Sequence, residues 1–564
     1  MSTADDERFY RDTESIAFPK LDDHQLSLLE PLGVRRTVRS GEVIFGAGER
    51  EFPMVVVIAG ELEAYETRDG VEQNLANPGP RDFVGEVSML TGTSSSASVR
   101  GRAEESEVLL IPAAKFRKAL ADLPGVGEPV VQAFIMRRKR LMRDPDFPGL
   151  RTVAHEKCRV GHRIDDFLDK NHIPHHLISS TSEAGRALCH LHGVAVEDLP
   201  VLIASDGTIF KQPTMREIAR VAGLLRPLTE EGETEVWCDL AVVGAGPAGL
   251  AAAVNAASEG LKTVVLESFA PGGQAGSSSL IENFFGFPTG ISGGDLTGRA
   301  QLQAHRFGAK FSTPSQALSL SFPEGEHGAA ICIEGCGAVL RAKAVIISTG
   351  AQYNLIEAEG RERFEGLGVF YAATVMESKF CHEKTVIVAG AGNSAGQAAM
   401  FLSEYARRVI MVVRGADLSK SMSSYLSSRV EAKENIEILF HSEIRKMTGS
   451  VRLEEVEIED KQTGLRRTVE TAAVFSMIGA KPCTTWLPPE ILMDGRGFIK
   501  TGPAVADAPA WKNADRSPYA FETSVPGIFA AGDVRSGSVK RCSAAVGEGS
   551  MAIENVHQML GTYT

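Results

Sequence analysis

The sequence of 564 residues contains no apolar run long enough to cross a bilayer, and its first 15 residues contain no apolar segment of the signal-peptide type. Basic residues are in deficit, because 59 Lys and Arg stand against 72 Asp and Glu, for a formal net charge of −13. A nucleic-acid-binding face needs an excess of positive charge. We therefore expect a cytoplasmic protein with neither a membrane nor a nucleic acid as its partner.

Paired cysteines are absent as well. None of the eight cysteines belongs to a C-x-x-C pair, and no His and Cys residues have the spacing of a zinc site. The sequence therefore predicts no metal centre and no dithiol that spacing alone would reveal. Unpaired cysteines are typical of a reducing compartment, which agrees with a cytoplasmic location.

Two glycine-rich motifs indicate nucleotide binding, and the first is 241-AVVGAGPAGL-250. After an apolar strand, Gly244 permits a tight turn, Gly246 lets backbone amides approach a pyrophosphate, and Gly249 allows the next helix to pack closely. The helix N-terminus then faces the negative charge. Glu267 ends the next apolar run, where an acid can bind a ribose hydroxyl. This pattern predicts a dinucleotide site.

The second motif, 385-TVIVAGAGNSAGQAAMFL-402, repeats the order of strand, glycine turn and small-residue helix. Its three turn positions are occupied by Gly390, Gly392 and Ala395. The next apolar strand, 408–414, ends in Arg414 rather than an acid, and Lys420 follows closely. Basic residues at this place favour a 2′-phosphate. We therefore predict FAD at the first motif and NADPH at the second.

A third stretch, 526-PGIFAAGDVRSGSVKRCSAAVGEG-549, places Gly532-Asp533 after a short strand and begins a small-residue helix around Ser543. Such an Asp can hydrogen-bond a flavin's ribityl chain, while the helix N-terminus faces the electron-rich edge of the ring. From Val236 onward the chain resembles the low-molecular-weight thioredoxin reductases. The resemblance rests on 244-GAGPAG-249, 271-PGGQ-274, 281-IENFFGFP-288, 345-VIISTGA-351, 390-GAGNSA-395 and 528-IFAAGD-533.

The resemblance implies a homodimeric flavoprotein oxidoreductase with two Rossmann-like three-layer α/β domains that uses FAD and NADPH. The FAD-binding residues would be Gly244, Gly246, Pro247, Ala248, Gly249, Glu267, Gly273, Gln274, Asn283, Gly350, Gly532, Asp533, Arg541, Cys542 and Ser543. The NADPH-binding residues would be Gly390, Gly392, Asn393, Ser394, Ala395, Arg414 and Lys420. The family's basic cluster has three arginines, and Gly415 and Ser419 replace two of them here.

The sequence departs from this family at the redox-active cysteines. The family's Cys-Ala-Thr-Cys motif aligns with Ala372, Ala373, Thr374 and Val375. Hydride transfer from nicotinamide to flavin needs no cysteine, so an NADPH oxidoreductase remains the prediction. Its electron acceptor is open: a thioredoxin-like protein, a ferredoxin or a small molecule. The alternatives are a ferredoxin/flavodoxin–NADP reductase-type enzyme and a flavin- or nucleotide-sensing scaffold.

Cys542 is the one cysteine with a candidate catalytic role. The resemblance places it near the flavin, and a thiol at a helix N-terminus can have a lowered pKa. An inert small residue that packs on the ring is the simpler interpretation.

Short apolar stretches at 41–49, 54–66, 82–90 and 107–112 predict a β-roll at the N-terminus, and 128–142 predicts its closing helix. The roll resembles the cyclic-nucleotide-binding domains, in which a Gly-Glu pair binds the phosphate and ribose and an arginine pairs with the phosphate. Ser95 takes the place of that arginine. The domain therefore either binds a cyclic nucleotide or is a degenerate domain that serves for docking or dimerisation, which is the preferred interpretation. The site residues would be Gly85, Glu86, Ser95 and Ser96.

Between 150 and 230, a helix and strand at 163–178, a hairpin at Asp206-Gly207 and a helix at 214–225 resemble the thioredoxin/glutaredoxin fold. Pro200 occupies that family's cis-proline position, but only Cys158 stands where the family has C-x-x-C. The chain is thus predicted to be multidomain. The predicted domains are a cyclic-nucleotide-binding-like β-roll at 1–145, a thioredoxin-like α/β domain at 150–230, an FAD-binding domain at 236–352 and 486–564, and an NADPH-binding domain at 353–485.

Overall fold

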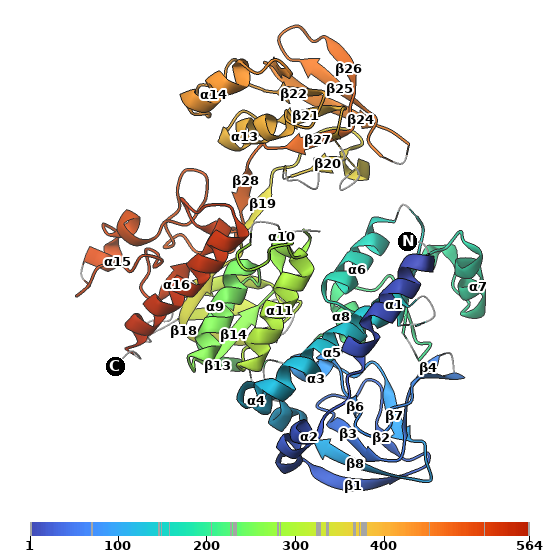
Figure 1. The fold of residues 1–564 in the computed structure, drawn as a ribbon. Helices are drawn as coiled ribbons and strands as arrows, with labels where there is room; N and C mark the ends of the chain where they lie inside the picture. The colour runs from blue at the N-terminus through green and yellow to red at the C-terminus, as the bar shows by residue number, and fades with distance from the viewer. Residues whose placement is uncertain are drawn as a thin grey trace. The chain divides into compact units, whose positions relative to one another are not determined.

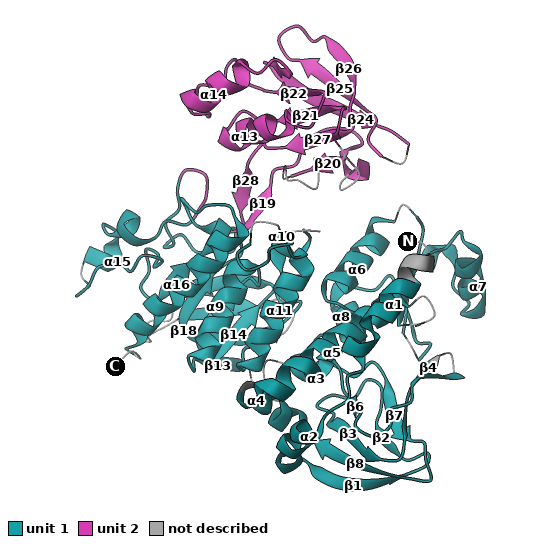
Figure 2. Ribbon diagram, in the orientation of Figure 1, with its two compact units in different colours: residues 1–350, 484–494, 499–564 teal, residues 351–483, 495–498 magenta. Residues whose placement is uncertain are grey.

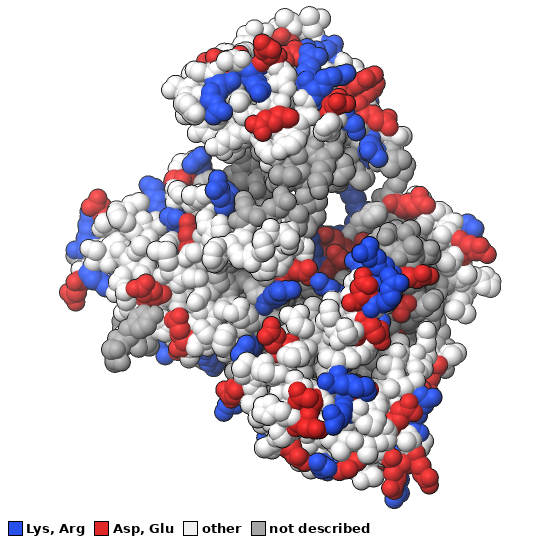
Figure 3. All heavy atoms as spheres, viewed as in Figure 1, with Lys and Arg blue, Asp and Glu red and all other residues white. Residues whose placement is uncertain are grey.

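The computed structural model describes residues 3–68, 71–144, 147, 149–156, 158–204, 206–225, 228, 234–278, 281, 284–322, 329–333, 338–364, 368–371, 373, 381–450, 452–512 and 514–561. The chain divides into two compact units, a larger one of residues 1–350, 484–494 and 499–564 and a smaller one of residues 351–483 and 495–498 (Figures 1 and 2). Among the described residues, no helix is both long and apolar enough to cross a membrane. On the face drawn in Figure 3, described Lys and Arg side chains are interspersed with Asp and Glu.

The larger unit begins with a roll of two antiparallel four-stranded sheets, ordered β1-β8-β3-β6 and β2-β7-β4-β5. The strands are β1 (Val34–Arg39), β2 (Val43–Phe45), β3 (Met54–Ala59), β4 (Leu62–Arg68), β5 (Val71–Ala76), β6 (Phe83–Val84), β7 (Ser98–Gly101) and β8 (Glu105–Ile111). The helices are α1 (Thr3–Ala17), α2 (Asp23–Leu29), η1 (Glu30–Leu32), α3 (Val87–Thr91), α4 (Ala113–Asp122) and α5 (Pro124–Arg143). The predicted stretch 54–66 is two strands, because Gly60 turns the chain at φ +83°.

The predicted strand 82–90 is a strand only at β6 and continues as α3. The strand ends where α5 packs closely against it. A Cβ at Gly85 would lie 2.6 Å from the ring of Phe134, so the chain passes this ring at a glycine. Phe83 and Phe134 are both buried in the core of the roll. The predicted closing helix 128–142 is confirmed as part of α5.

The next segment forms a separate four-stranded sheet, ordered β10-β9-β11-β12, in which β9 is parallel to β10 and antiparallel to β11. Its elements are β9 (Leu150–Ala154), α6 (Arg159–Lys170), β10 (His175–Ser179), α7 (Glu183–Leu191), η2 (Val196–Asp198), β11 (Val201–Ile203), β12 (Ile209–Lys211) and α8 (Met215–Val221). The peptide between Leu199 and Pro200 is cis. The predicted hairpin joins β11 to β12. The strand β9 was not predicted from the sequence. It is buried along its whole length, and its sequence, LRTVA, does not alternate between apolar and polar residues.

The rest of the larger unit is built on a seven-stranded sheet, ordered β15-β14-β13-β18-β17-β16, with β29 beside β18. The central strand β13 belongs to two cores, one on each face, and this explains its continuous apolar run. The strands are β13 (Glu235–Val243), β14 (Thr263–Leu266), β15 (Lys310–Ser312), β16 (Ala317–Ser321), β17 (Ala329–Ile333), β18 (Val339–Ile347) and β29 (Ile528–Ala530). The helices are α9 (Pro247–Ser258), α10 (Gly273–Gly276), α11 (Gly293–Arg306), η4 (Gly502–Val505), α15 (Pro509–Lys512), η5 (Gly532–Val534) and α16 (Cys542–Leu560).

The smaller unit has a five-stranded parallel sheet, ordered β20-β27-β21-β22-β23. Its strands are β20 (Val369–Phe370), β21 (Thr385–Ala389), β22 (Arg408–Val412), β23 (Ile436–Leu439) and β27 (Ala473–Ser476). An antiparallel sheet of β24 (Ser442–Thr448), β25 (Glu455–Asp460) and β26 (Arg466–Glu470) and a pair of β19 (Ala351–Tyr353) and β28 (Ala480–Pro482) complete the strands. The helices are η3 (Arg361–Phe364), α13 (Asn393–Leu402) and α14 (Ser424–Glu431).

Candidate nucleotide-binding sites

The first glycine turn connects β13 to α9 at the carboxyl end of the parallel strands. Gly244 has φ +101°, and a Cβ there would lie 2.5 Å from the carbonyl oxygen of Ser348. Gly246 caps α9, and a Cβ at Gly249 would lie 1.8 Å from the carbonyl oxygen of Gly244. The turn is therefore as tight as the motif predicts, and the free amides of the first helical turn of α9 form an anion-binding end.

Glu267 lies directly after β14, beside this turn, and is buried. One carboxylate oxygen accepts a hydrogen bond from the Ala245 N–H at 2.8 Å, and the other accepts one from the Phe269 N–H at 2.9 Å. Burial raises the pKa of Glu267, and the backbone hydrogen bonds oppose this rise. The carboxylate is thus fixed next to the turn as an acceptor, which is the arrangement that a ribose hydroxyl requires.

The segment that contains Gly273 and Gln274 packs on the same turn. Gly272 and Gly273 have φ +113° and +54°, and a Cβ at Gly273 would lie 3.0 Å from the Cα of Gly246. Gln274 lies in the short helix α10. The structure thus brings the predicted PGGQ residues to the first turn, whereas Asn283 lies outside the described residues.

The C-terminal motif reaches the turn from the other side. Gly532 has φ +78°, and a Cβ there would lie 2.9 Å from the Cβ of Ala248 in α9. Its N–H donates to a carboxylate oxygen of Glu548 at 2.7 Å, a residue of α16 that sequence reasoning missed. The following Asp533 is partly buried, and this burial raises the pKa of its carboxyl group. Four separate sequence segments therefore converge on one turn.

Arg541, Cys542 and Ser543 stand at the start of α16, with Arg541 as its N-cap. Burial and the neighbouring carboxylate of Asp533 raise the pKa of the Cys542 thiol to about 11. The possibility of a lowered pKa at this helix N-terminus is therefore wrong, because desolvation and a like charge outweigh the helix amides. Cys542 is a protonated thiol at neutral pH.

The second glycine turn, in the smaller unit, has the same kind of backbone conformation as the first. Gly390 has φ +139°, and a Cβ there would lie 2.4 Å from the carbonyl oxygen of Met477. Gly392 caps α13, and Ala395 is fully buried one turn into the helix. Ser394 is exposed at the helix N-terminus, where its hydroxyl is accessible. Asn393 accepts a hydrogen bond from the Ser423 N–H at 2.8 Å, which ties the turn to the chain that follows Lys420.

The basic residues predicted for the second turn lie just after β22. Arg414 and Lys420 are both exposed, and neither forms an ion pair with a described residue. Asp417 lies between them and was not part of the prediction. Its carboxylate accepts hydrogen bonds from the hydroxyl and N–H of Ser419, at 2.6 Å and 2.9 Å, and these hold the pKa of Asp417 below its usual value. The two cations are thus available to a solvent-side anion, with one carboxylate beside them.

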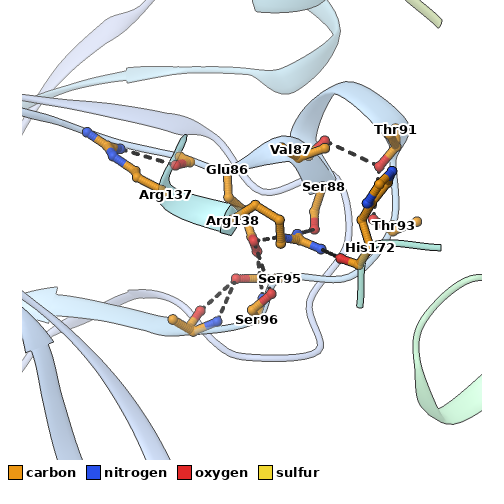
Figure 4. Close-up of polar contacts among 12 residues, drawn as sticks. Glu86, Val87, Ser88, Thr91, Thr93, Ser95, Ser96, Arg137, Arg138 and His172 are labelled. Carbon is orange, nitrogen blue, oxygen red and sulfur yellow. Dashed lines mark hydrogen bonds and ion pairs between the residues drawn. The ribbon is translucent and has the colours of Figure 1, made fainter. Parts of the chain in front are cut away.

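The predicted cyclic-nucleotide residues interact with one another and with α5 (Figure 4). One oxygen of Glu86 accepts from the Ser96 N–H at 2.6 Å, and the other accepts from the Ser96 hydroxyl at 3.0 Å and from Arg138 Nη2 at 2.7 Å. The Ser95 hydroxyl donates to the Ala97 carbonyl oxygen at 2.6 Å. The acid that would bind a ribose and both serines are therefore engaged within the protein.

Comparison with known families agrees with this division. Residues 238–549 match the pyridine nucleotide-disulphide oxidoreductases, and residues 35–122 match the cyclic nucleotide-binding domain. The chain belongs to the pyridine nucleotide-disulphide oxidoreductase family. It is an NAD(P)H-dependent flavoprotein oxidoreductase similar to thioredoxin reductase, preceded by a cyclic nucleotide-binding domain.

Two curated relatives of this oxidoreductase each match more than half of the chain. A 34.2 kDa protein in the rubredoxin operon of Clostridium pasteurianum is 31% identical over 327 residues, 58% of this chain and 98% of that protein. Thioredoxin reductase from Treponema pallidum is 32% identical over 314 residues, 56% of this chain and 94% of that protein. Among solved structures, thioredoxin reductase from Giardia duodenalis is 28% identical, with a TM-score of 0.49, and the match covers 58% of this chain and 99% of that one.

The family uses FAD and NADPH, and the residues of this chain fit both. At the first turn, a Cβ at Gly246 would have no close neighbour other than the Cα of Gly273, at 4.0 Å, so the backbone there is open to a pyrophosphate. The buried acceptor of Glu267 lies beside it. At the second turn the accessible Arg414 replaces this acid. Ala372 and Val375, which align with the family's two cysteines, lie outside the described residues.

Proposed function

We propose that this flavoprotein transfers electrons from NADPH through FAD directly to its acceptor, without the dithiol of the thioredoxin reductases. The observation that carries the proposal is the contrast between the charged residues at the two turns. The first has the buried Glu267, an acceptor for ribose hydroxyls, and the second has the exposed Arg414, a donor for a 2′-phosphate. The first therefore suits FAD and the second NADPH.

In this proposal the chain's residues bind and orient the two nucleotides. Backbone amides at the start of α9 and α13 bind the pyrophosphates, and Glu267 binds the adenosine ribose of FAD. Asp533 would contact the ribityl chain, and the start of α16 would contact the ring. FAD, when bound, would supply the redox chemistry of hydride transfer from NADPH. A homodimer is also proposed, from the resemblance to thioredoxin reductase.

The cysteine chemistry supports direct transfer from the flavin. Ala372 and Val375 replace the family's two cysteines. Burial raises the pKa of Cys238 to about 12, and the Cys542 thiol, near 11, is likewise protonated at neutral pH. A thiol must be deprotonated to act as a nucleophile. The acceptor is therefore a thioredoxin-like protein, a ferredoxin or a small molecule that meets the flavin itself.

The proposal gives the N-terminal parts a docking or regulatory role rather than a redox one. The engagement of Glu86 by Arg138 and Ser96 favours a roll that binds no cyclic nucleotide with the family's affinity. We assign residues 1–145 to this roll and 150–230 to a thioredoxin-like domain that retains the cis-Pro200 but has only Cys158 where that family has C-x-x-C. The FAD-binding domain is 236–352 and 486–564, and the NADPH-binding domain is 353–485.

An anaerobic titration with dithionite, followed by flavin absorbance, tests the absence of a dithiol. We expect two electrons per FAD, because the flavin would be the one redox centre. An uptake of four electrons would reveal a disulfide coupled to the flavin and would overturn the proposal. In that case, the variant Cys542→Ser would test whether the thiol at the start of α16 is part of that disulfide.

Coenzyme choice is tested with Arg414→Ala. Loss of one charge-assisted hydrogen bond should raise the KM for NADPH about tenfold and leave the KM for NADH within about twofold. Arg466→Ala is the matched control. This exposed arginine lies in β26, in a different sheet of the same unit from the one that precedes Arg414, and it pairs with Glu457 of β25. Equal effects on both coenzymes would show that Arg414 does not bind the 2′-phosphate.

A further inference from the structure

A cavity of about 110 Å³ lies within the larger unit and belongs to none of the sites above. It is open to solvent on one side and is lined by α3, α5, the turn between α6 and β10, and α11. These elements come from the N-terminal roll, the second α/β segment and the FAD-type domain. Since a buried water needs roughly 10–15 Å³ of such space, the cavity has room for a small organic molecule.

The cavity is apolar with a basic margin. The apolar lining includes Val87, Ile135, Met142, Ile173 and Leu302. The charged lining residues are Arg138, Lys139, Asp295 and Arg299. Asp295 pairs with Lys139 at 2.6 Å, and Arg138 pairs with Glu86 outside the cavity at 2.7 Å. Arg299 is exposed and forms no ion pair with a described residue, so with these two pairs the lining carries one net positive charge.

Arg138 is held in place on two sides (Figure 4). Its Nη2 donates to Glu86 and, at 3.0 Å, to the Ser88 hydroxyl, and its Nη1 donates to the His172 carbonyl oxygen at 3.0 Å. Its Nε is buried and has no hydrogen-bond partner among the described residues. A buried donor without an acceptor is costly, so an acceptor beside Arg138 would be stabilising.

His172 adds a polar group without a net charge. Its ring lines the cavity and makes no side-chain hydrogen bond with a described residue. Burial, and next the charge of Arg138, lower the pKa of His172, so the ring is neutral at pH 7 and can donate one hydrogen bond. The cavity thus offers donors, one net positive charge and an apolar interior.

We propose that this cavity binds a small organic monoanion with an apolar body, such as an aromatic carboxylate, through Arg299, Arg138 and His172. Such a ligand would compensate the free charge of Arg299 and provide the acceptor that Arg138 Nε lacks. Its apolar body would lie against Ile135 and Leu302. A small anionic effector site, distinct from the Gly85-Glu86 site, follows from this arrangement.

The same helix connects the cavity to the proposed FAD site. Six residues of α11, from Gly294 to Leu302, line the cavity. Gly293 and Thr297 of the same helix pack against the segment 272–276, which contains α10. A Cβ at Gly293 would lie 1.7 Å from the Ala275 carbonyl oxygen, and one at Gly272 would lie 2.7 Å from the Thr297 hydroxyl. A ligand that moves α11 would therefore move Gly273 and Gln274. This coupling rests on the proposed function, whereas binding does not.

Isothermal titration calorimetry of the full FAD-loaded chain with benzoate tests binding. We expect one saturable site, at least tenfold weaker binding of neutral benzamide, and at least a tenfold loss of benzoate affinity in Arg299→Gln. Leu302→Trp, which fills the cavity, should abolish binding. Arg306→Gln, on the same helix but outside the lining, is the control. FAD content and circular dichroism establish that each variant is folded.

Absence of benzoate binding, equal binding of benzamide, or unchanged binding in folded Arg299→Gln and Leu302→Trp would overturn the proposed site. Flavin fluorescence is recorded in the same titration, and we expect it to change as the site fills. Binding without such a change would overturn the coupling through α11 alone. Because heat is measured rather than turnover, failure of the proposed electron transfer would leave this test unaffected.

Discussion

The two glycine turns of this protein have the same backbone and opposite charges. Each turns at a glycine with positive φ after a buried parallel strand, and each begins a helix at a glycine N-cap. The first is completed by a buried acid and the second by an exposed base. The shared backbone thus suits pyrophosphate binding at both turns, while the residue after the second strand and its burial distinguish one nucleotide from the other.

The largest effect should come from Gly249, the third position of the first turn. Ala395 is the corresponding residue of the second turn. Gly249→Ala would place a methyl group 1.8 Å from the Gly244 carbonyl oxygen, so we expect loss of FAD and a decrease of about 3 kcal/mol in the free energy of unfolding. Ala395→Gly should cost only about 1 kcal/mol. The ratio of flavin to protein absorbance and urea unfolding measure both. A Gly249→Ala variant with full FAD would mean that the turns are equivalent.

Arg414→Glu should make the second turn resemble the first in charge. Loss of the guanidinium and repulsion of the 2′-phosphate should reduce the preference for NADPH over NADH about 100-fold. The ratio of kcat/KM for the two coenzymes measures the change. Retention of the NADPH preference would place the 2′-phosphate elsewhere.

A smaller effect is expected from Glu267→Gln at the first turn. The carboxylate accepts from two backbone N–H groups, and one amide oxygen cannot serve both. We expect the dissociation constant of FAD to rise about tenfold, measured by equilibrium dialysis. Glu259→Gln, a residue at the far end of α9 that pairs with His557, should leave the dissociation constant unchanged. Equal losses in both variants would assign the effect to folding instead.

The smallest effect should come from Asp417→Asn at the second turn. Hydrogen bonds from Ser419 hold the pKa of Asp417 below its usual value, so the group is ionised at neutral pH. Removal of this exposed charge beside Arg414 should lower the KM for NADPH about twofold at low salt, and added salt should remove the difference. A KM that rises in the variant would contradict the proposed position of the 2′-phosphate.

Prediction from the sequence succeeded where local rules determine the structure. Both turns could be located because only glycine tolerates the backbone of Gly244 and Gly390. The closing helix of the roll and the hairpin between β11 and β12 also follow from periodicity and turn residues. The strand β9 was not predicted, because its polar residues Arg151 and Thr152 are buried and the local sequence does not indicate such burial.

The candidate sites were predicted less completely, because their partners are distant in sequence. Glu548 lies 16 residues from Gly532 on another element, and Arg138 lies 52 residues from Glu86. Both lie in stretches that the sequence singles out, 526–549 and 128–142, but residue spacing does not show which distant group each side chain contacts. The same holds for Cys542, whose raised pKa depends on burial and on Asp533 rather than on its place at a helix N-terminus.

The sequence by itself determined the two nucleotide-binding motifs, the acid and the base that distinguish them, and the absence of C-x-x-C. These are properties of short segments, in which residue type and spacing fix the backbone and its charge. The tertiary structure alone decided that Glu86 is engaged by Arg138, that Cys542 is a neutral thiol, and that a basic cavity lies beside α11. Each depends on burial and on contacts between distant segments, and only the folded chain brings these together.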